Sequence, residues 1–288
     1  MSSQEAPGTL YVVSTPIGNM GDFSFRAVEI LRQVNLILAE DTRHTRGLLA
    51  RYDISTPALS YHEHNEAKTT PALVARLEAG ESFALVSDAG TPLISDPGSR
   101  LVAACAAGGI PVVPIPGASA VLAALVASGI DASRFTFFGF LTRTGRERRQ
   151  ALDEITTMRH TVVLYEAPNR LAATLGELEQ RGNADRLAAV AREMTKQYEE
   201  VRRGTVEQLR AYYEDNPPRG EIVLVLDAAP VRRATEDTVR ERIQALRATG
   251  MSTKDVAAMV AEELSVPKRL AYRLAQESTQ ERSEGVDE

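Results

Sequence analysis

The chain has little of several features that often reveal a protein's class. It holds one cysteine, Cys105, and no tryptophan among its 288 residues. A lone cysteine forms no intramolecular disulfide, rules out a cysteine-rich zinc site and suits a reducing compartment. No apolar run nears the roughly 18 residues that a membrane span needs. The polar residues 1–8 lack the basic and apolar regions of a signal peptide. We therefore expect a cytoplasmic protein without a membrane partner.

Several signature motifs are also missing. No G-x-G occurs, which excludes the Rossmann dinucleotide fingerprint, and no G-K-S or G-K-T occurs, which excludes a P-loop. The G-x-S-x-G elbow of α/β-hydrolases is missing as well. His62 and His64 have no cysteine nearby and no H-E-x-x-H pattern, so they fit hydrogen-bonding loop residues better than metal ligands. We expect no bound metal.

The charge of the chain is unevenly distributed. The formal net charge is −6, from 33 Lys and Arg against 39 Asp and Glu, and this total argues against a uniformly basic nucleic-acid binder. Residues 141–150 nevertheless hold four arginines and one glutamate, a local charge of +3. Residues 232–273 hold nine basic and six acidic residues, again +3, and the last twelve residues carry −4. Local basic patches are thus compatible with the acidic total.

Short apolar runs alternate with longer amphipathic segments through most of the chain. This alternation predicts βαβ units, a largely parallel sheet and hence an α/β fold. We expect strands at residues 10–14, 36–39, 83–87, 112–114, 135–138, 161–165, 187–191 and 222–226. We expect helices at residues 24–34, 70–79, 98–107, 117–128, 171–180 and 206–213. One α/β half ends and another begins near Pro116.

The composition changes after Leu226, where Ala228-Ala229-Pro230 is typical of a linker. Three helices are expected beyond it, at residues 235–248, 253–264 and 267–276. A basic three-helix unit with a short turn is typical of a helix-turn-helix, and a simple packing appendage explains it equally well. The predicted domains are therefore 8–116, 117–229 and 233–280.

Polar segments rich in Gly and Pro follow the expected strands, at the sheet edge where α/β proteins bind ligands. The densest is Ser87–Gly98, with two Gly, two Pro and two Asp in twelve residues, more than a turn requires. In Glu40–Arg46, two acids and two arginines favour a functional role over a plain helix start. Weaker signals, which ordinary turns, packing or surface pairs also explain, are residues 14–19, 60–66, 114–120, 165–170, 191–196 and 219–221.

Taken together and in order, these segments resemble the tetrapyrrole methylase superfamily over about residues 10–226. The most specific pieces are Thr15-Pro16-Ile17-Gly18-Asn19, Glu40-Asp41-Thr42-Arg43, Ser87–Gly98 and Ala191-Arg192-Glu193-Met194-Thr195-Lys196. Tetrapyrrole-modifying members carry a G-D-P turn where this chain has Ser87-Asp88-Ala89-Gly90, so the chain is more similar to the branch that methylates small-subunit ribosomal RNA. One departure is Thr142, which stands where the family usually has Pro after G-F-L.

The resemblance implies two α/β domains of the tetrapyrrole methylase type with a small C-terminal helical domain, assembled as a homodimer. It implies S-adenosylmethionine bound between the α/β domains, and methyl transfer to the ribose 2′-oxygen of a cytidine in 16S ribosomal RNA. By position in the family's motifs, the cofactor would be bound by Pro16, Asp88, Ala89, Gly90, Thr91, Ile94, Ser119, Ala120, Leu141, Tyr165, Ala191 and Gly220. The alternatives are a methylase of a small tetrapyrrole and a non-catalytic RNA-binding module.

A ribose hydroxyl is a weak nucleophile, so its methylation calls for a base or a cation beside it. The candidates for this catalytic role are Glu40, Asp41, Glu193 and Lys196, with His62 a further one. The residues expected to bind the RNA are Arg43, Arg46, His62, Asn65, Arg143, Arg146 and Arg148. Spaced arginines with few aromatics suit phosphate contact, although a solvated helix face explains residues 141–150 equally well.

Overall fold

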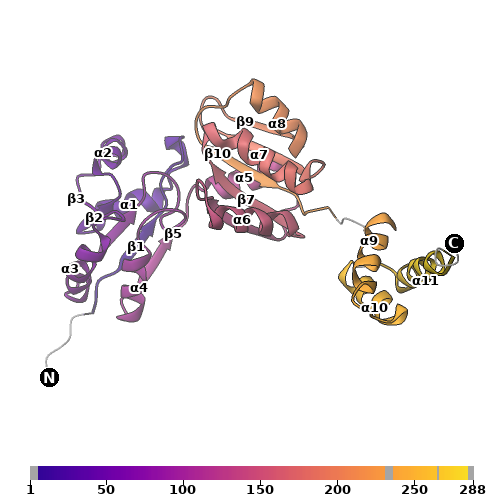
Figure 1. Ribbon diagram of the computed structural model, residues 1–288. Coiled ribbons are helices and arrows are strands. Elements are labelled where there is room, and N and C mark those ends of the chain that lie inside the picture. Colours follow the sequence, from indigo (N-terminus) through magenta and orange to yellow (C-terminus); the bar gives the residue numbers. More distant parts are fainter. Residues whose placement is uncertain (1–5, 231–235, 265, 285–288) are drawn as a thin grey trace. The chain divides into compact units, whose positions relative to one another are not determined.

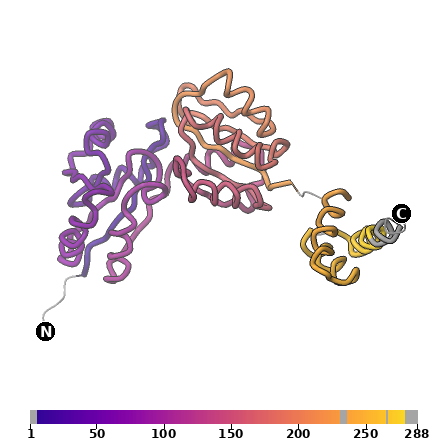
Figure 2. Tube along the Cα trace, viewed as in Figure 1, coloured from indigo at the N-terminus to yellow at the C-terminus, as the bar shows by residue number. Residues whose placement is uncertain are grey.

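The computed structural model describes residues 6–230, 236–264 and 266–284. The chain divides into two compact units, Met1–Ala229 and Pro230–Glu288. The first unit contains two α/β halves, and the colour ramp of Figure 2 passes through one half before it enters the other. Each half is therefore continuous in sequence. None of the helices in the described ranges is long and apolar enough to cross a membrane.

The first half contains a five-stranded sheet in the order β3-β2-β4-β1-β5, and all its strand pairs are parallel. The strands are β1 (Leu10–Val13), β2 (Leu36–Ala39), β3 (Ala58–Ser60), β4 (Phe83–Val86) and β5 (Val112–Ile115). The helical elements are η1 (Met20–Asp22), α1 (Phe25–Gln33), α2 (Thr42–Arg51), α3 (Glu66–Glu78) and α4 (Ser99–Ala107). Because the strands are parallel, the loops that follow β1, β2 and β4 lie at the same edge of the sheet.

Helices cover both faces of this first sheet (Figure 1). Successive side chains of a strand point to opposite faces. Ile37 accordingly packs in the core beneath α1 and α2, whereas Leu36 and Leu38 pack in the core beneath α3 and α4. Strands buried on both faces are apolar throughout, which explains why the short runs at β2 and β4 were recognisable in the sequence.

The second half contains a five-stranded sheet in the order β6-β7-β10-β8-β9. Its strands are β6 (Phe135–Phe140), β7 (Thr161–Glu166), β8 (Leu187–Arg192), β9 (Glu200–Thr205) and β10 (Ile222–Leu226). β6 and β7 are parallel, but β10 runs antiparallel to β7 and β8, and β8 runs antiparallel to β9. The expectation of a largely parallel sheet is wrong for this half. Alternating apolar runs do not reveal strand direction, which depends on the connections.

Helices also cover both faces of the second sheet. The apolar, small-residue helix α5 (Ala120–Ser128) packs on one face. The helices α6 (Arg146–Thr157), α7 (Leu171–Leu178) and α8 (Val206–Asp215) pack on the other, with the short elements η2 (Pro168–Arg170) and η3 (Glu179–Asn183) between them in sequence. Ile17 from the loop after β1 and Met194 from the loop after β8 join the core beneath α5. This core therefore links the two halves.

The C-terminal unit is a helical one with its own apolar core. Its helices are α9 (Glu236–Arg247), α10 (Thr253–Glu263) and α11 (Lys268–Glu284). The Ser252 hydroxyl caps α10 by accepting a hydrogen bond from the Asp255 amide at 3.2 Å. Arg240 and Arg273 pair with Glu277 at 2.7 and 3.1 Å, so part of the basic charge is neutralised inside this unit. The predicted domain 233–280 starts in residues 233–235, which lie outside the described residues.

Candidate functional site

A cavity of about 480 Å³ lies where the carboxyl ends of β2 and β4 approach the end of β7 and the start of β10. β10 runs antiparallel to β7, so Ile222 stands beside Glu166 and both belong to this edge. We call it the acid-lined cavity, and its size is that of a small-molecule site. Its lining residues are Ile17, Glu40, Asp88, Ala89, Gly90, Thr91, Ile94, Ser95, Asp96, Ser119, Ala120, Phe140, Tyr165, Glu166, Ala167, Pro168, Gly220, Glu221, Ile222 and Val223.

The charge of this cavity has one sign. Its lining includes the carboxylates of Glu40, Asp88, Asp96, Glu166 and Glu221, and none of its lining residues is Lys, Arg or His. Glu166 is buried and compensated, because it accepts hydrogen bonds from Thr174 and the Ala167 amide and pairs with an arginine outside the lining, Arg170. Glu221 likewise pairs with a lysine outside the lining, Lys196, at 3.1 Å. The carboxylates of Glu40, Asp88 and Asp96 remain, and they give the cavity a negative potential that favours a cationic ligand.

Two of these carboxyl groups have raised pKa values. Burial raises the pKa of Glu40, and the neighbouring charge of Asp88 adds to the effect. Burial also raises the pKa of Asp96 to about 6, with repulsion from Glu40 and Asp88 adding to it and a hydrogen bond from Ser87 opposing it. Crowded carboxylates without a cation disfavour ionisation. A bound positive charge would relieve that repulsion.

Apolar side chains form another part of the same lining. Phe140 is 60% exposed and Ile94 is 43% exposed, although both are large and apolar. The Phe140 ring lies 5.2 Å from the Tyr165 ring, centroid to centroid. Burial, with the charges of Asp96 and Glu221, raises the pKa of Tyr165 to about 12, so this ring is neutral. The surface suits a flat aromatic group of a ligand.

Glycines allow two close approaches of the backbone at this site. Gly90 has φ of +83°, and its amide and carbonyl exchange hydrogen bonds with Thr15 at 3.1 and 2.8 Å, which holds the loop after β4 against the loop after β1. Gly220 has φ of +86°, and a Cβ there would meet the Glu193 side chain at 2.3 Å. Non-glycine residues rarely adopt such φ values, so both turns depend on glycine.

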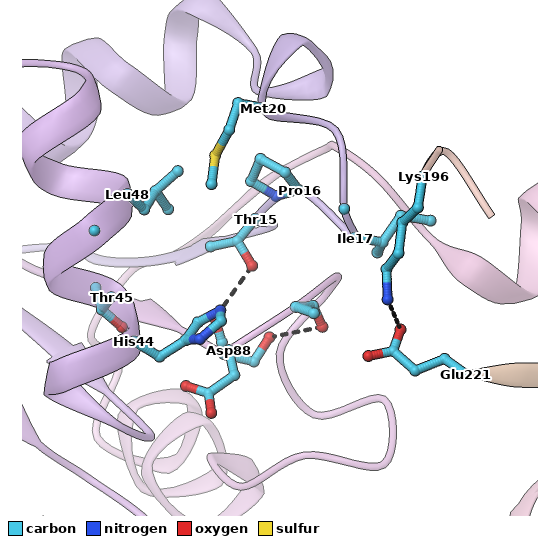
Figure 3. A pocket seen from close by; sticks show the side chains of 14 residues that line it. Thr15, Pro16, Ile17, Met20, His44, Thr45, Leu48, Asp88, Lys196 and Glu221 are labelled. Atoms are coloured by element: carbon cyan, nitrogen blue, oxygen red, sulfur yellow. Dashed lines mark hydrogen bonds and ion pairs between the residues drawn. The ribbon is translucent and has the colours of Figure 1, made fainter. Parts of the chain in front are cut away.

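A second cavity, of about 360 Å³, adjoins the first, and we call it the Lys196 cavity (Figure 3). Ile17, Asp88, Ala89 and Glu221 line both cavities and form a shared wall. The remaining lining residues of the Lys196 cavity are Thr15, Pro16, Gly18, Met20, His44, Thr45, Gly47, Leu48, Ser87 and Lys196.

Lys196 is held in place at this shared wall. Its Nζ lies 3.0 Å from Glu193 Oε1 and 3.1 Å from Glu221 Oε2, the second contact being visible in Figure 3. Its stem passes over Gly18, where a Cβ would meet the Lys196 Cγ at 2.3 Å. Burial lowers the pKa of Lys196, but the hydrogen bonds to Glu193 and Glu221 outweigh it and the net change is upward. Lys196 is therefore a positioned cation at neutral pH and not a base.

Two of the other candidate catalytic acids, Asp41 and Glu193, have hydrogen-bond partners in the structure. Asp41 caps α2 through the Arg43 amide at 2.8 Å and pairs with the Arg43 guanidinium at 2.6 Å, which holds the pKa of Asp41 well below its usual range. Glu193 accepts the Glu221 amide at 2.9 Å, and this bond together with Lys196 lowers the pKa of Glu193. Glu40 lines the acid-lined cavity. Their catalytic roles stay predictions, and these contacts favour a positioning role for Asp41 and Glu193.

Most of the predicted cofactor residues are brought together. Nine of them line the acid-lined cavity: Asp88, Ala89, Gly90, Thr91, Ile94, Ser119, Ala120, Tyr165 and Gly220. Pro16 lines the Lys196 cavity instead. Leu141 and Ala191 are buried in the two cores of the second half. Their assignment to cofactor binding stays a prediction.

The predicted RNA-binding arginines differ in exposure. The side chain of Arg43 is 85% exposed, Arg46 lines a separate hollow of about 320 Å³, and Arg143 and Arg146 are exposed. Arg148 is not the exposed cation that the sequence suggested. Its side chain is 7% exposed, pairs with Glu177 at 2.7 Å and donates to Thr174, because this position of α6 faces the core beside Leu152. Its contacts are those of a structural residue.

The histidine segment forms a loop with internal hydrogen bonds. Asn65 accepts the His62 amide at 2.9 Å and donates to the Ser60 carbonyl at 2.9 Å. The rings of His62 and His64 lie 5.9 Å apart, edge to face. In the part of the chain that the structure describes, no group of three His, Cys, Asp or Glu residues is placed to hold a metal. RNA binding by His62 and Asn65 stays a prediction.

Several lining residues were not singled out from the sequence. Asp96 lies inside the quoted segment Ser87–Gly98, and Phe140 stands one residue before Leu141, so position next to a motif was the available signal. Glu221 lines both cavities, although its segment was only a weak signal. Its role depends on the contact with Lys196, which is 25 residues distant in sequence, and no local pattern reveals such a contact.

Comparisons with known proteins agree with the resemblance found in the sequence. The chain is 48% identical over 273 residues to a ribosomal RNA small subunit methyltransferase I of Synechocystis sp., covering 94% of this chain and 98% of the relative. It is 41% identical over 272 residues to the protein of that name from Bacillus subtilis, covering 92% and 93%.

Among solved structures, cobalt precorrin-4 methyltransferase, a cobalamin biosynthetic enzyme, shares the fold at a TM-score of 0.59 and 17% identity, over 76% of this chain and 94% of that one. Uroporphyrin-III C-methyltransferase of Thermus thermophilus, complexed with S-adenosylhomocysteine, shares the fold at a TM-score of 0.56 and 18% identity, over 76% of this chain and 97% of that one. The family model of tetrapyrrole (corrin/porphyrin) methylases matches residues 9–210. The chain therefore belongs to the tetrapyrrole methylase family.

Proposed function

We propose that the protein is an S-adenosylmethionine-dependent methyltransferase of small-subunit ribosomal RNA, which methylates the ribose 2′-oxygen of a cytidine. The observation that carries this proposal is the pair of adjoining cavities, of which one is negative and the other places Lys196 at the shared wall. Relatives with 41% and 48% identity over more than nine-tenths of the chain are named as methyltransferases of this RNA. A tetrapyrrole substrate is less well supported, because the neighbours named as precorrin and uroporphyrin methyltransferases share 17% and 18% identity over 76% of this chain.

The residues of the acid-lined cavity fit S-adenosylmethionine. Its sulfonium and ammonium charges match a lining with carboxylates and without basic residues. Phe140, Tyr165 and Ile94 offer an apolar surface for the adenine, and Ser119 and Ala120 place the first amides of α5 beside the cavity for the carboxylate. The cofactor supplies a methyl group already activated on sulfur, so the protein's task is to position the ribose oxygen and stabilise its charge.

We assign to Lys196 the stabilisation of the negative charge on the ribose oxygen. It remains protonated between Glu193 and Glu221, so it can stabilise the negative charge that develops on the ribose oxygen. Glu193 positions it through contacts with Lys196 Nζ and the Glu221 amide. Glu221 is the carboxylate of the shared wall that contacts Lys196, and we assign to it the acceptance of the hydroxyl proton.

Methyl transfer can be tested directly. Unmodified small ribosomal subunits are incubated with the protein and with S-adenosylmethionine labelled on its methyl group, and the labelled nucleotide is mapped. Label on the ribose of one cytidine is expected. Label on a tetrapyrrole substrate alone would favour the alternative enzyme, and subunit binding without label would favour a non-catalytic module.

The exposed arginines Arg43, Arg46, Arg143 and Arg146 are proposed to contact RNA phosphates. Each lost phosphate contact should reduce the slope of log affinity against log salt by about 0.7 for single-stranded RNA. Arg146→Gln should show this reduction in a filter-binding titration, whereas Arg26→Gln, an exposed arginine on α1, should not. An unchanged slope for Arg146→Gln would remove this residue from the proposed RNA surface.

A homodimer is also part of the proposal. The exposed apolar side chains of Leu122 and Val126, 53% and 81% exposed, lie one turn apart on α5 and offer a surface that a second copy could cover. Sedimentation equilibrium of the protein and of a Val126→Asp variant tests the association. A ribosomal substrate would place the protein in the cytoplasm, in agreement with its single cysteine.

A further inference from the structure

Thr45 carries a buried hydroxyl with unused hydrogen-bonding capacity. The residue is 2% exposed, lines the Lys196 cavity, and its Oγ1 has no hydrogen-bond partner within the described residues. Buried polar atoms in folded proteins are almost always paired, so an unpaired one calls for an explanation. A ligand in the cavity would supply the missing partner.

Other threonines in helices of this protein form a hydrogen bond through the hydroxyl that Thr45 does not form. The hydroxyls of Thr69 and Thr70 in α3 donate to the carbonyls of Asn65 and Glu66, four residues earlier, at 2.9 and 2.7 Å. This is the usual way for a helical threonine to satisfy its hydroxyl. Thr45 instead makes its helical bond through the amide alone, to the Asp41 carbonyl at 3.0 Å. Its hydroxyl therefore has no partner among the described residues.

A second, independent observation in the same cavity is that Gly47, which lines it, has no side chain to fill it. It lies inside α2, where glycine weakens a helix relative to alanine. A Cβ at Gly47 would have no other atom within 4 Å, so close packing does not explain the glycine. Since Gly47 lines the Lys196 cavity, the open space above it lies where an occupant would be.

The walls of the cavity combine apolar surfaces with a few polar groups. Pro16, Met20 and Leu48 provide apolar side chains, and His44 and Thr45 provide polar ones. In Figure 3, α2 brings His44 and Thr45 to one side of the cavity, and Lys196 stands on the other. Enzymes that modify a base take it out of the stack into such a pocket, and proteins that recognise a specific RNA sequence bind unstacked bases in the same way, with apolar groups at the faces and polar groups at the edge.

We propose that the Lys196 cavity receives one unstacked pyrimidine nucleoside, with the base edge at Thr45 and the ribose at Lys196. This inference rests on the proposed function, and it names the site that takes the target nucleotide. The carboxylate of Asp88 can accept a hydrogen bond from the amino group of cytosine, whereas it repels the carbonyl oxygen of uracil. Cytidine should therefore bind more tightly than uridine.

The binding of free nucleosides tests the pocket without any methyl transfer. The full chain is labelled with ¹³C at its methionine methyls and saturated with S-adenosylhomocysteine, which keeps added nucleosides out of the acid-lined cavity. Cytidine and uridine are then titrated while the Met20 methyl signal, assigned with Met20→Leu, is followed by NMR. Met251 and Met259 of the C-terminal unit serve as internal controls.

Cytidine is expected to shift the Met20 signal saturably, with a lower Kd than uridine. Thr45→Val removes the hydroxyl at nearly constant shape and should weaken cytidine binding by about fivefold, the effect of one hydrogen bond. Thr45→Ser keeps the hydroxyl and should bind like the wild type. Gly47→Leu should abolish the shift without lowering the unfolding temperature, because leucine is the better helix former.

Three results would overturn the pocket. These are no movement of Met20 up to the solubility limit of cytidine, equal Kd values for the wild type and Thr45→Val, or full cytidine binding by Gly47→Leu. The proposed function can fail separately. If cytidine binds as expected but ribosomal subunits take up no methyl label, the pocket stands and the methyltransferase assignment falls. If ribosomal subunits are methylated but cytidine does not shift the Met20 signal, the methyltransferase assignment stands and the pocket falls.

Discussion

The two cavities share a wall, yet their charges differ. The acid-lined cavity contains carboxylates and none of its lining residues is basic, whereas the Lys196 cavity adds Lys196 and His44 to the shared Asp88 and Glu221. A methyl donor with a sulfonium is cationic, and the ribose oxygen that attacks its methyl group gains negative charge as the hydroxyl proton leaves. The acid-lined cavity therefore has the charge that complements the methyl donor, and Lys196 supplies a single positive charge at the shared wall for the ribose oxygen.

The largest effect expected from this comparison is on turnover when Lys196 loses its charge. Lys196→Met keeps the length of the side chain, and removing one charge-stabilising group of this kind costs about 10²–10³-fold in rate. Single-turnover methylation of ribosomal subunits measures the loss. Calorimetry should find S-adenosylmethionine still bound, because the acid-lined cavity is intact.

Two controls sharpen that result. Lys196→Arg keeps the positive charge and should recover part of the activity, and Lys68→Met on the exposed side of α3 should have none of the effect. If Lys196→Met turned over like the wild type, the charge of the Lys196 cavity would have no part in the reaction. If Lys196→Met also lost its affinity for S-adenosylmethionine, Lys196 would act on the cofactor in the acid-lined cavity and not on the ribose.

The next effect is on cofactor binding when space is removed from the acid-lined cavity. Ala120 lies at the start of α5 and lines this cavity, so the larger side chain of Ala120→Leu would occupy part of it. We expect S-adenosylmethionine to bind about tenfold to a hundredfold more weakly, the cost of overfilling a packed site. Calorimetry measures the Kd, and Ala106→Leu at an exposed position of α4 is the control. Unchanged affinity would show that the cofactor does not reach α5.

Local patterns in the sequence were enough for much of the fold. The apolar runs Leu36–Ala39 and Ile222–Leu226 were predicted with the bounds that the structure has, because strands buried on both faces contain no polar residue. β9 was missed because its residues, Glu200–Thr205, are mostly polar and only half-buried. α6 was not among the expected helices, although a solvated helix face was an alternative for residues 141–150, because the arginines there concealed its apolar face.

The site was predictable to the extent that it depends on strand ends. Asp88, Gly90 and Ser119 follow strands whose ends lie at one edge of the sheet, so the order of strands alone predicts that their segments are close together. The contact of Lys196 with Gly18 joins residues far apart in sequence, and the burial of Arg148 depends on Glu177 of a different helix. The unpaired hydroxyl of Thr45 is likewise a property of the packed structure. No local sequence pattern predicts any of these three features.

The smallest effect concerns the pH dependence of cofactor binding, which should set the two cavities apart. Asp96 lines only the acid-lined cavity of the two, and burial raises its pKa from 3.8 to about 6. Its folded-state pKa lies above the usual value, so this group's contribution to stability is present below pH 4 and is lost as the pH rises through about 6. A bound cation favours the ionised carboxylate and therefore lowers that pKa. Binding of S-adenosylmethionine should release a proton near pH 6.

Affinity should consequently rise with pH, by at most about tenfold between pH 5 and pH 7, since one proton is linked to binding. Calorimetry at each pH, in buffers of different ionisation enthalpy, measures both the Kd and the released proton. Asp96→Asn should bind with little pH dependence over this range. Cytidine binding to the Lys196 cavity, followed through Met20, should be the same in the wild type and in Asp96→Asn at each pH, because Asp96 does not line that cavity. A pH-independent cofactor affinity in the wild type would mean that the positive charge of the ligand lies elsewhere than beside Asp96.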